Sequence, residues 1–422
     1  MRILWVSNSP LSHSGYGSQT RQVGRRLLAA GYDVEFSAND GSRAGTWEGA
    51  TVRGSGFDQY SRDKVREDIE RSGADWTIVL YDPWVYMQAE GDPFAGNPRV
   101  LAWAPVDHYP TPPSMTPWLY QHGAIAMSQF GHQALAQTIE AGRQRKGYER
   151  GFPLYYAPHA IEPVFRPTPS DFRRSINVPE DAYVVGIVAA NTGGQIYDRK
   201  GWGDMLAGAA WFMESHPDAY LYLHTQLRPS GGIPLQALVN FVPGLPVDRI
   251  RWADQYRMKD DGYTDADMAA VYSGLDVLLA TSRGEGFGIP VIEAQACGTP
   301  VIVSNWTAQP ELVGEPWAIS RMGRRREASG WVVSVDPDFD LRHASFFGKP
   351  IIADINGALA DAYAHRGDPD IKAAAIAKAA EYDADRVFDA YWRPILADME
   401  RALTEKPNRA QRRAARKAKV AA

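Results

Sequence analysis

The sequence predicts an α/β protein built from two Rossmann-like domains, and three observations lead to that fold class. First, the chain opens with an apolar strand, a glycine-containing loop, a helix and a second strand within residues 1–36. Second, residues 271–313 repeat the order strand, loop, helix, strand. Third, a proline-rich stretch at residues 158–167 lies between the two regions and is typical of a linker.

Length and composition limit the classes of protein to which the chain can belong. Its 422 residues suit two or three ordinary domains, and a hydrophobic content of 45% is enough for sizeable cores. The net charge of −5 argues against a protein that coats nucleic acid. The single cysteine, Cys297, excludes an internal disulfide and favours a reducing compartment. No apolar run reaches the roughly 18–20 residues of a membrane span, and the N-terminus is not a signal peptide, so we expect a cytoplasmic protein.

The N-terminal domain begins with a strand at residues 3–7. The loop after this strand carries Gly15, Tyr16 and Gly17, and we expect the following helix to begin at about Ser18 as its N-cap. The glycine spacing does not match the dinucleotide-binding fingerprint, so we do not predict such a site here. From the residues alone, this loop is either a ligand contact or a plain tight turn.

Two further apolar strands, residues 76–81 and 100–104, should end at the same edge of the first sheet. Asp107 and His108 follow the second of these strands. An aspartate beside a histidine suits proton handling or the orientation of a sugar hydroxyl, and a structural role at the strand end is the alternative. Residues 124–128 are expected to form the last strand of this domain.

The second domain begins with a strand at residues 183–191, which ends at Asn191. Arg199 and Lys200 follow in a glycine-containing loop, directly before a helix expected at residues 202–214. An arginine can donate to two phosphate oxygens and a lysine supplies a point charge, so this pair predicts a diphosphate clamp. Two solvated surface charges are the alternative.

The loop after the apolar strand at residues 276–280 is the main candidate for a ligand site. It lies between the carboxyl end of that strand and the amino end of the next helix, where open α/β sheets bind ligands. Gly286 and Gly288 allow main-chain N–H groups to approach a phosphate, and the helix N-terminus adds partial positive charge. Glu285 and Glu293 bracket the loop, and carboxylates accept hydrogen bonds from hydroxyl groups. We therefore expect a ligand with a phosphate and several hydroxyl groups.

The segment that starts at Glu285, EGFGIPVIEAQACGTPV, resembles the signature of the retaining glycosyltransferases of family 4. The similarity extends from Met268 to about Val313. It implies the GT-B fold, in which two Rossmann-like domains face each other across a cleft. It also implies that Glu285 contacts the donor sugar and that Glu293 contacts the nucleotide ribose. The main-chain groups that would meet the diphosphate or the sugar belong to Gly286, Phe287, Gly288 and Ile289.

The resemblance implies roles for residues outside the signature. Lys200 and Arg199 would neutralise the leaving nucleoside diphosphate, and Asn191 stands nearest to the place of an arginine that the family often carries. The family often has a His-Asp pair after the strand at 100–104. Here the order is reversed to Asp107-His108, which leaves open which of the two takes the role. The residues that would line the acceptor or diphosphate side of the cleft are Gly15, Tyr16 and Gly17.

The expected domain limits follow from the same resemblance. Residues 1–160 would form the acceptor domain and residues 161–387 the nucleotide-sugar domain, with 330–333 as its final strand. A helix at about residues 388–405 would return to the first domain. The basic tail at residues 406–422 has the composition of a disordered segment and resembles tails on proteins of actinobacterial phages, which suggests a phage gene and weak contact with nucleic acid.

The implied reaction is transfer of a sugar from a nucleotide-sugar, such as a UDP- or GDP-sugar, to a hydroxyl acceptor with retention of configuration. We expect no cofactor, and no metal, because the sequence shows no cluster of metal ligands. The acceptor stays open: a modified DNA base, a Ser or Thr of a virion protein, or a glycan or lipid of the cell envelope. Two other classes also stay open, a GT-B protein that binds sugar without turnover and a nucleotide-sugar epimerase.

Overall fold

The computed structural model describes most of the 422 residues. The described residues are 1–58, 60–82, 85–86, 92–95, 97, 99–112, 115–146, 153–192, 197–229, 231–316 and 323–404. The basic tail at residues 406–422, for which the sequence predicts disorder, lies outside this set. None of the described helices is both long enough and apolar enough to cross a membrane.

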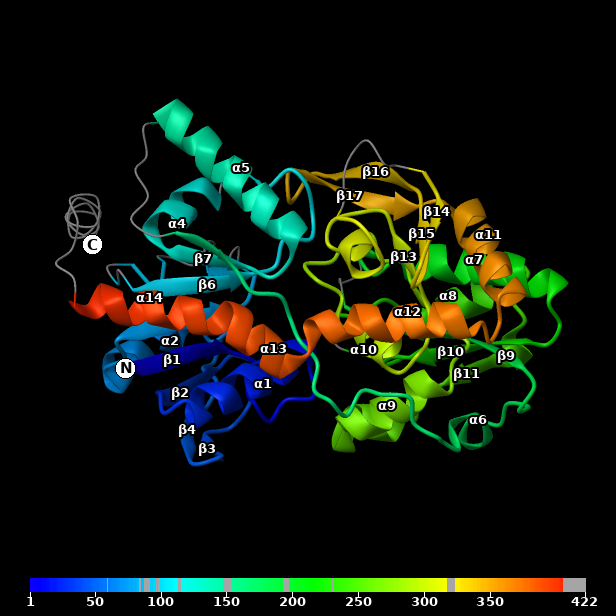
Figure 1. Ribbon diagram of the computed structural model, residues 1–422, viewed down its shortest axis with the longest axis horizontal. Coiled ribbons are helices and arrows are strands. Elements are labelled where there is room, and N and C mark those ends of the chain that lie inside the picture. Colours follow the sequence, from blue (N-terminus) through cyan, green and yellow to red (C-terminus); the bar gives the residue numbers. More distant parts are fainter. Residues whose placement is uncertain are drawn as a thin grey trace. The chain divides into compact units, whose positions relative to one another are not determined.

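The chain forms two compact units, each organised around one main sheet (Figure 1). Unit 1 comprises Met1–Val106, Pro110–Ala160 and Ala384–Ala422, and unit 2 comprises Asp107–Tyr109 and Ile161–Asp383. In both sheets, parallel strands alternate along the chain with helices. This arrangement confirms the predicted α/β class with two Rossmann-like domains.

Unit 1 contains an eight-stranded sheet in the order β3-β4-β2-β1-β5-β6-β7-β8. Its strands are β1 (Arg2–Ser7), β2 (Asp33–Ala38), β3 (Gly45–Trp47), β4 (Ala50–Arg53), β5 (Trp76–Leu80), β6 (Val100–Ala104), β7 (Gly123–Ala126) and β8 (Leu154–Tyr156). The pairs are parallel except for β3 with β4. The expectation that residues 124–128 form the last strand is wrong, because β8 adds to the sheet with Leu154 opposite Ala124.

The first helix begins earlier than the sequence predicts. The helices within the described residues of unit 1 are α1 (Gly15–Ala29), α2 (Arg62–Ser72), α4 (Met115–Gln121), α5 (Gln129–Lys146), α13 (Ala384–Val387), the π-helix η7 (Phe388–Trp392) and α14 (Arg393–Thr404). The N-cap is Ser14 rather than Ser18, because the Ser14 hydroxyl accepts a hydrogen bond of 3.1 Å from the N–H of Gly17. Glycine is required at position 17, since a Cβ there would lie 2.5 Å from the Ser12 carbonyl oxygen.

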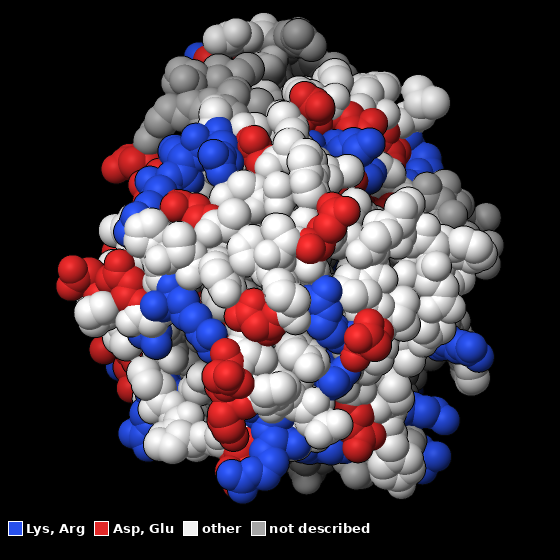
Figure 2. Space-filling model, turned by 90° about the vertical axis from the view of Figure 1, so that its right-hand side faces the viewer, with Lys and Arg blue, Asp and Glu red and all other residues white. Residues whose placement is uncertain are grey.

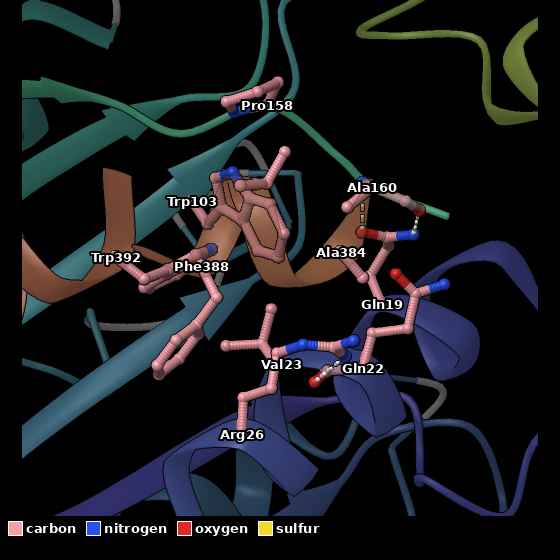
Figure 3. Close-up of a pocket in the computed structure, with 11 residues that line it drawn as sticks. Gln19, Gln22, Val23, Arg26, Trp103, Pro158, Ala160, Ala384, Phe388 and Trp392 are labelled. Carbon is pink, nitrogen blue, oxygen red and sulfur yellow. Dashed lines mark hydrogen bonds between the residues drawn. The ribbon is translucent and has the colours of Figure 1, made fainter. Parts of the chain in front are cut away.

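The C-terminal helices contribute to the core of unit 1. The Trp392 ring lies 5.7 Å from that of Trp5 and 4.9 Å from that of Trp103. Figure 3 shows a pocket that Trp103 and Trp392 help to line. At this pocket, Gln19 of α1 exchanges two hydrogen bonds of 2.8 and 3.1 Å with the main chain of Ala160. The segment before Ile161 is therefore fixed to α1.

Unit 2 contains a seven-stranded sheet in the order β11-β10-β9-β12-β13-β15-β14. Its strands are β9 (Tyr183–Val188), β10 (Ala219–His224), β11 (Ile250–Trp252), β12 (Val277–Ala280), β13 (Val301–Ser304), β14 (Arg325–Glu327) and β15 (Gly330–Val333). The pairs are parallel except for β14 with β15. The central strands are short buried apolar runs, which suit a parallel sheet covered on both faces.

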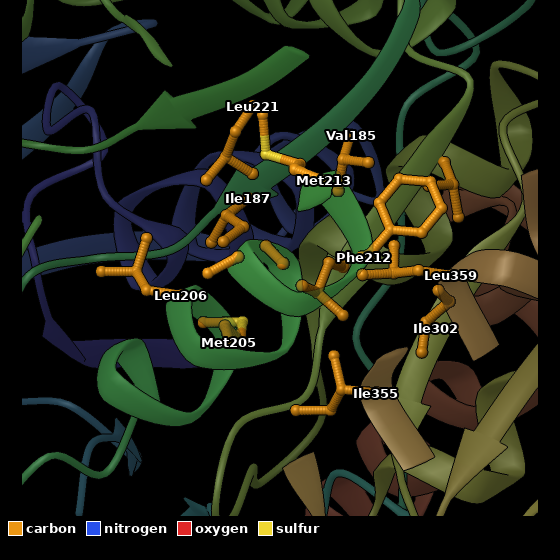
Figure 4. Close-up of a cluster of buried hydrophobic side chains, with 14 of the residues drawn as sticks. Val185, Ile187, Met205, Leu206, Phe212, Met213, Leu221, Ile302, Ile355 and Leu359 are labelled. Carbon is orange, nitrogen blue, oxygen red and sulfur yellow. The ribbon is translucent and has the colours of Figure 1, made fainter. Parts of the chain in front are cut away.

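Helices α7 and α11 cover one face of this sheet and enclose a core of buried hydrophobic residues (Figure 4). Alternate residues of β9, β10, β12 and β15 belong to that core. Val185 and Ile187 of β9, for example, lie in it with Phe212 of α7 and Leu359 of α11. The helices of unit 2 are α6 (Phe172–Ser175), α7 (Trp202–Ser215), α8 (Leu235–Phe241), η2 (Val247–Arg249), η3 (Arg257–Asp261), α9 (Asp265–Ser273), α10 (Ile289–Ala296), η4 (Gln309–Leu312), α11 (Ile352–Ala364), α12 (Pro369–Ala379) and η6 (Ala380–Tyr382).

A hairpin that the sequence does not predict follows β15. Strands β16 (Val335–Asp340) and β17 (Ser345–Pro350) pair antiparallel and form a separate two-stranded sheet. The expectation that residues 330–333 form the final strand is therefore wrong. Asp340 fixes the turn, since its carboxylate accepts a hydrogen bond of 2.8 Å from the N–H of Arg342 and contacts the Arg342 guanidinium at 3.0 Å.

Candidate functional site

The loop between β12 and α10 has the geometry that the sequence predicts. Gly288 is the N-cap of α10 with φ +115°, a left-handed conformation that glycine adopts without strain. Pro290 stands in the first turn of α10, where its missing N–H costs nothing. Gly298, with φ +79°, ends the helix before β13. These positions confirm the predicted strand, loop, helix and strand.

The N-terminus of α10 offers unused hydrogen-bond donors. The N–H groups of Gly286, Gly288 and Ile289 donate to no acceptor within the described part of the chain. Phe287 anchors the loop between them, because its buried ring packs 5.4 Å from the ring of Tyr382. Free N–H groups together with the positive end of a helix dipole favour a bound anion.

Thr307, which no sequence motif singles out, holds Glu285 in place. The N–H of Glu285 donates to the Thr307 hydroxyl at 3.1 Å, and that hydroxyl donates to the Glu285 carbonyl oxygen at 3.0 Å. Thr307 adopts φ +51°, a conformation that a β-branched residue rarely takes. Backbone strain of this kind is found where structure fixes a functional group.

Lys200 and Arg199 both contact the Glu285 loop. The Nζ atom of Lys200 lies 2.7 Å from Oε1 of Glu285, and the Arg199 guanidinium lies 3.5 Å from Oε2. The same guanidinium donates to the carbonyl oxygen of Gly284 at 2.9 Å, and the N–H of Arg283 donates to the Arg199 carbonyl oxygen at 2.9 Å. The predicted basic pair and the predicted carboxylate therefore form one cluster.

Burial and neighbouring charge act in opposite directions on this cluster. Burial acts to raise the pKa of Glu285, but the positive charges of Lys200 and Arg199 outweigh it and hold the pKa below its usual value. Burial lowers the pKa of Lys200, and the negative charge of Glu285 opposes that shift. Glu285 is thus ionised and balances the charge of Lys200 within the protein.

Asp107 and His108 lie beside the same arginine. A carboxylate oxygen of Asp107 is 3.4 Å from the Arg199 guanidinium, and the other is 2.7 Å from Nδ1 of His108. Burial acts to raise the pKa of Asp107, but the hydrogen bond with His108 and the charge of Arg199 hold it well below its usual range. Nε2 of His108 is buried and has no hydrogen-bond partner among the described residues. The imidazole is therefore oriented by Asp107 and has one nitrogen available to a ligand.

The hairpin β16–β17 joins the His108 segment to the Glu285 loop. Phe346 exchanges main-chain hydrogen bonds of 3.0 and 3.1 Å with Tyr109, and the N–H of Gly348 donates to the Arg283 carbonyl oxygen at 2.8 Å. The buried ring of Phe347 lies 5.6 Å from the ring of His108. Strand β17 is thus a brace between two segments that carry predicted site residues.

Glu293 projects from α10 and pairs with a residue outside the predicted set. The Tyr272 hydroxyl of α9 donates to the Glu293 carboxylate at 2.7 Å. Burial raises the pKa of Glu293 to about 7, against the opposing effect of that hydrogen bond. A carboxyl group in this state gains a proton easily and can also accept hydrogen bonds from ligand hydroxyls.

The remaining predicted residues have different surroundings. Asn191 is buried, and its amide bonds the main chain of the 226–233 loop, with contacts of 3.1 Å to Gln226 and of 3.0 and 2.9 Å to Ile233. Its contacts in the described structure therefore orient that loop. The other predicted residues, at the start of α1 in unit 1, are Gly15, Tyr16 and Gly17.

The cluster in unit 2 can bind a phosphate and polarise a bond to it. Its cations are Arg199 and Lys200, and its carboxylates are Glu285 and Asp107. The imidazole of His108, oriented by Asp107, and the N-terminus of α10 complete it. In the described part of the chain, no three His, Cys, Asp or Glu side chains form a group that could hold a metal ion.

Two Rossmann-like units, with this cluster at the loop ends of one of them, define a protein of the GT-B fold class. Solved structures show the same fold. Sucrose-phosphate synthase from Thermosynechococcus elongatus aligns with a TM-score of 0.67 and 17% identity over 94% of this chain and 100% of that chain. An Escherichia coli structure described as trehalose-6-phosphate bound with UDP-2-fluoro glucose aligns with a TM-score of 0.64 and 12% identity, over 94% and 99% of the two chains.

The match to a family model lies within unit 2. A family model described as "Glycosyl transferases group 1" matches residues 241–329. The "O-antigen chain mannosyltransferase B" of Escherichia coli is 44% identical over 55 residues, which cover 13% of this chain and 14% of that protein. The chain spans about a third or less of the length of the curated relatives it matches.

Proposed function

We propose that the protein is a glycosyltransferase that moves a sugar from a nucleotide-sugar to a hydroxyl acceptor. The observation that carries this proposal is the contact of Lys200 and Arg199 with Glu285 at the N-terminus of α10. The contact places groups that can bind an anion next to a carboxylate, that of Glu285, which can accept hydrogen bonds from hydroxyl groups. The matched segment, residues 241–329, contains Glu285, Glu293 and all of α10, which supports the same activity.

In the proposed reaction, the donor diphosphate lies against Lys200, Arg199 and the free N–H groups of α10. The bond between the anomeric carbon and the diphosphate oxygen breaks, and a bond from that carbon to the acceptor oxygen forms. The acceptor proton passes to the leaving phosphate. Negative charge grows on the diphosphate during bond breaking, so these cations and dipoles stabilise the transition state more than the bound donor.

The carboxylates and the imidazole orient the donor in this proposal. Glu285 accepts hydrogen bonds from sugar hydroxyls, and Glu293 accepts them from the ribose. Nε2 of His108 has no hydrogen-bond partner among the described residues. In the bound complex that we propose, this nitrogen forms a hydrogen bond with a sugar hydroxyl. We assign no covalent nucleophile to the protein, and we propose that the anomeric configuration is retained. Proton NMR of the first-formed product tests retention, since an inverted anomeric coupling would contradict it.

Release of nucleoside diphosphate tests the activity. Purified protein is incubated with a panel of UDP- and GDP-sugars, with and without hydroxyl acceptors, and the released diphosphate is measured. We expect release from one or a few donors. Binding of a donor without any release would indicate a sugar-binding protein, and a changed sugar without diphosphate release would indicate an epimerase.

The composition of the sequence bears on the cellular compartment and on the origin of the gene. We propose a cytoplasmic protein, because the chain has one cysteine, Cys297, and that residue is buried. The composition of the tail at residues 406–422 supports a phage gene. The acceptors that this origin suggests are a modified DNA base and a Ser or Thr of a virion protein, and a cell-envelope glycan or lipid is the third candidate.

A further inference from the structure

In the sheet of unit 1, the order in which the chain adds strands reverses between β1 and β5. Strand β1 lies between β2 and β5, and the chain builds β2 on one side of it before it crosses to β5 on the other. In open parallel sheets, ligands bind outside the carboxyl ends of the strands at such a switch point. The residues that follow β1 and β5 therefore mark the expected ligand-binding edge of unit 1.

Tyrosine rings meet at this edge. The ring of Tyr16, which follows β1, lies 5.5 Å from the ring of Tyr81, which follows β5. The ring of Tyr60 lies 5.7 Å from Tyr81 on another side. All three side chains are partly exposed. Tyrosine rings of this kind present an apolar face and a polar tip, and both suit the flat surface of a sugar ring.

Two carboxylates, those of Asp40 and Asp82, lie near these rings. Asp82 lies 3.5 Å from the Tyr16 hydroxyl, and Asp40 follows β2 at the same edge, where its carboxylate accepts from the N–H of Ser9 at 3.1 Å. Burial and the negative charges of Asp82 and Asp40 raise the pKa of Tyr81, so its hydroxyl stays protonated. That hydroxyl forms no hydrogen bond with any residue that the structure describes. Tyr81 can therefore donate to a ligand oxygen.

A second unused polar group lies in the same cluster. The Asn39 side chain is 2% exposed, and its Nδ2 donates to the Tyr86 hydroxyl at 3.1 Å. Its Oδ1 has no partner among the described residues. The Tyr86 ring lies 6.3 Å from the ring of Tyr81. Unused hydrogen-bonding capacity thus continues from the surface into the interior behind the rings.

Two of the cations of this edge are already engaged. Both sides of the Arg62 guanidinium contact the Asp58 carboxylate, at 2.7 and 2.8 Å. Arg21 donates to the main-chain oxygens of Pro10 and Ser12 at 3.2 and 2.6 Å. A phosphorylated ligand would have to displace these contacts and would also meet the carboxylates of Asp40 and Asp82.

We propose that the Tyr16–Tyr60–Tyr81 surface with Asp40 and Asp82 binds the acceptor, and that the acceptor is a neutral carbohydrate. The inference rests on the proposed function. Sugar rings pack their C–H faces on aromatic rings, and their hydroxyls donate to carboxylates. Nucleic acid binds mainly through phosphates on Lys and Arg, so a surface with these carboxylates disfavours DNA.

Diphosphate release with matched probe acceptors tests the acceptor class. The probes are a set of neutral mono- and disaccharides including maltose, glucose 6-phosphate, single-stranded DNA with hydroxymethylcytosine, and a Ser/Thr-rich peptide. We expect a neutral saccharide to stimulate release most. Stimulation by none of the neutral saccharides, or stronger stimulation by the phosphorylated sugar, the DNA or the peptide, would overturn the proposal.

Substitutions at the surface test the site itself. Tyr81→Phe removes one donor, so we expect the acceptor KM to rise about fivefold. Asp82→Lys should shift the preference from maltose toward glucose 6-phosphate. Phe57→Ala is the matched control, because that side chain is fully exposed on the loop before Tyr60, and it should behave as the wild type. If Tyr81→Phe and Asp82→Lys both behave like Phe57→Ala, the site assignment is wrong.

Saturation-transfer NMR with maltose separates this inference from the proposed function. If the wild-type protein releases no diphosphate from any donor, the glycosyltransferase proposal fails, but saccharide binding can still be measured. A maltose signal in the wild type and in Phe57→Ala that is lost in Tyr81→Ala supports the surface. No signal in the wild type, or an equal signal in Tyr81→Ala, contradicts it.

Discussion

Lys200 is the residue on which the proposed chemistry most depends. It contacts Glu285 at 2.7 Å beside the N-terminus of α10. Replacement by alanine removes a cation from the growing charge on the leaving group, so kcat should fall by about 100-fold or more. Lys372→Ala, which removes an exposed lysine of α12, is the control. A Lys200→Ala rate within a few-fold of the wild type, in a folded protein, would contradict the role.

Glu285 should weaken the binding of the proposed diphosphate, because the diphosphate competes with the Glu285 carboxylate for Lys200. Glu285→Gln removes the competing charge and keeps the shape of the side chain. We expect the nucleoside diphosphate alone to bind about tenfold more tightly, since one charge-assisted hydrogen bond contributes about 1.5 kcal/mol. Sugar transfer should fall in the same variant. Calorimetric titration with UDP and GDP measures the affinity, and unchanged or weaker binding would argue against the competition.

Glu293 should make stability depend on pH. Its pKa is about 7 in the folded protein and 4.5 in the unfolded chain, so the folded state binds the extra proton between these values. Stability should therefore fall as pH rises from about 4.5 to about 7. Glu293→Gln removes this penalty and should gain up to about 3 kcal/mol over the wild type across that window.

Urea denaturation at the two ends of the pH window measures this gain. Glu214→Gln changes an exposed glutamate at the end of α7 and serves as the control. A difference between Glu293→Gln and the wild type that stays constant across the window would show that Glu293 does not carry the raised pKa.

At the scale of elements, the β16–β17 hairpin should control the position of His108. Phe347→Ala removes the ring that packs against His108, and kcat should fall by about tenfold or more while the donor KM changes little. Phe347→Leu refills most of the space and should recover much of the rate.

Phe339→Ala is the matched control for the hairpin, since Phe339 lies on the same strand pair and is 48% exposed. Thermal melts of each variant separate loss of positioning from loss of folding. If Phe347→Ala melts as a folded protein and turns over at the rate of Phe339→Ala, the hairpin does not position the imidazole.

Periodicity and turn residues predicted the elements that depend on local sequence. The sequence predicts the strand, loop and helix around Glu285 because Gly288, Pro290 and Gly298 have clear positional preferences. The sequence does not predict the hairpin, because VDPDFD contains a proline and three aspartates, which strands usually avoid. Its pairing depends on distant partners, β17 and Tyr109, which no local pattern reveals.

In the candidate site, too, contacts between segments far apart in the sequence cannot be predicted from local patterns. Glu285, Lys200 and Arg199 were identified from their surroundings in the sequence, and the structure brings them together. Thr307 could not be predicted, because its role depends on φ +51° and on two hydrogen bonds to Glu285. Tyr272 was also missed, because its contact with Glu293 joins two different helices.

At the scale of the whole molecule, we expect turnover without a divalent metal ion. Lys200, Arg199 and the N-terminus of α10 supply positive charge that a metal would otherwise bring. Turnover with the best donor should be unchanged after treatment with EDTA and dialysis. Loss of activity that returns on addition of magnesium or manganese would refute this expectation.

The distribution of charge on one face of the molecule does not favour the binding of nucleic acid there. The face in Figure 2 carries Lys and Arg side chains interspersed with Asp and Glu rather than a continuous basic surface. The net charge of the chain is −5. DNA that binds through phosphates needs clustered cations, and that face does not provide them.

The tripeptide Asp107–Tyr109 belongs to unit 2 although the chain on either side of it belongs to unit 1. Both neighbours of this tripeptide in the chain, Val106 and Pro110, belong to unit 1. A fragment limited to residues 161–383 would keep Lys200 and Glu285 but would lack the imidazole and its aspartate. A continuous fragment that omits unit 1 therefore cannot contain all the groups of the proposed site.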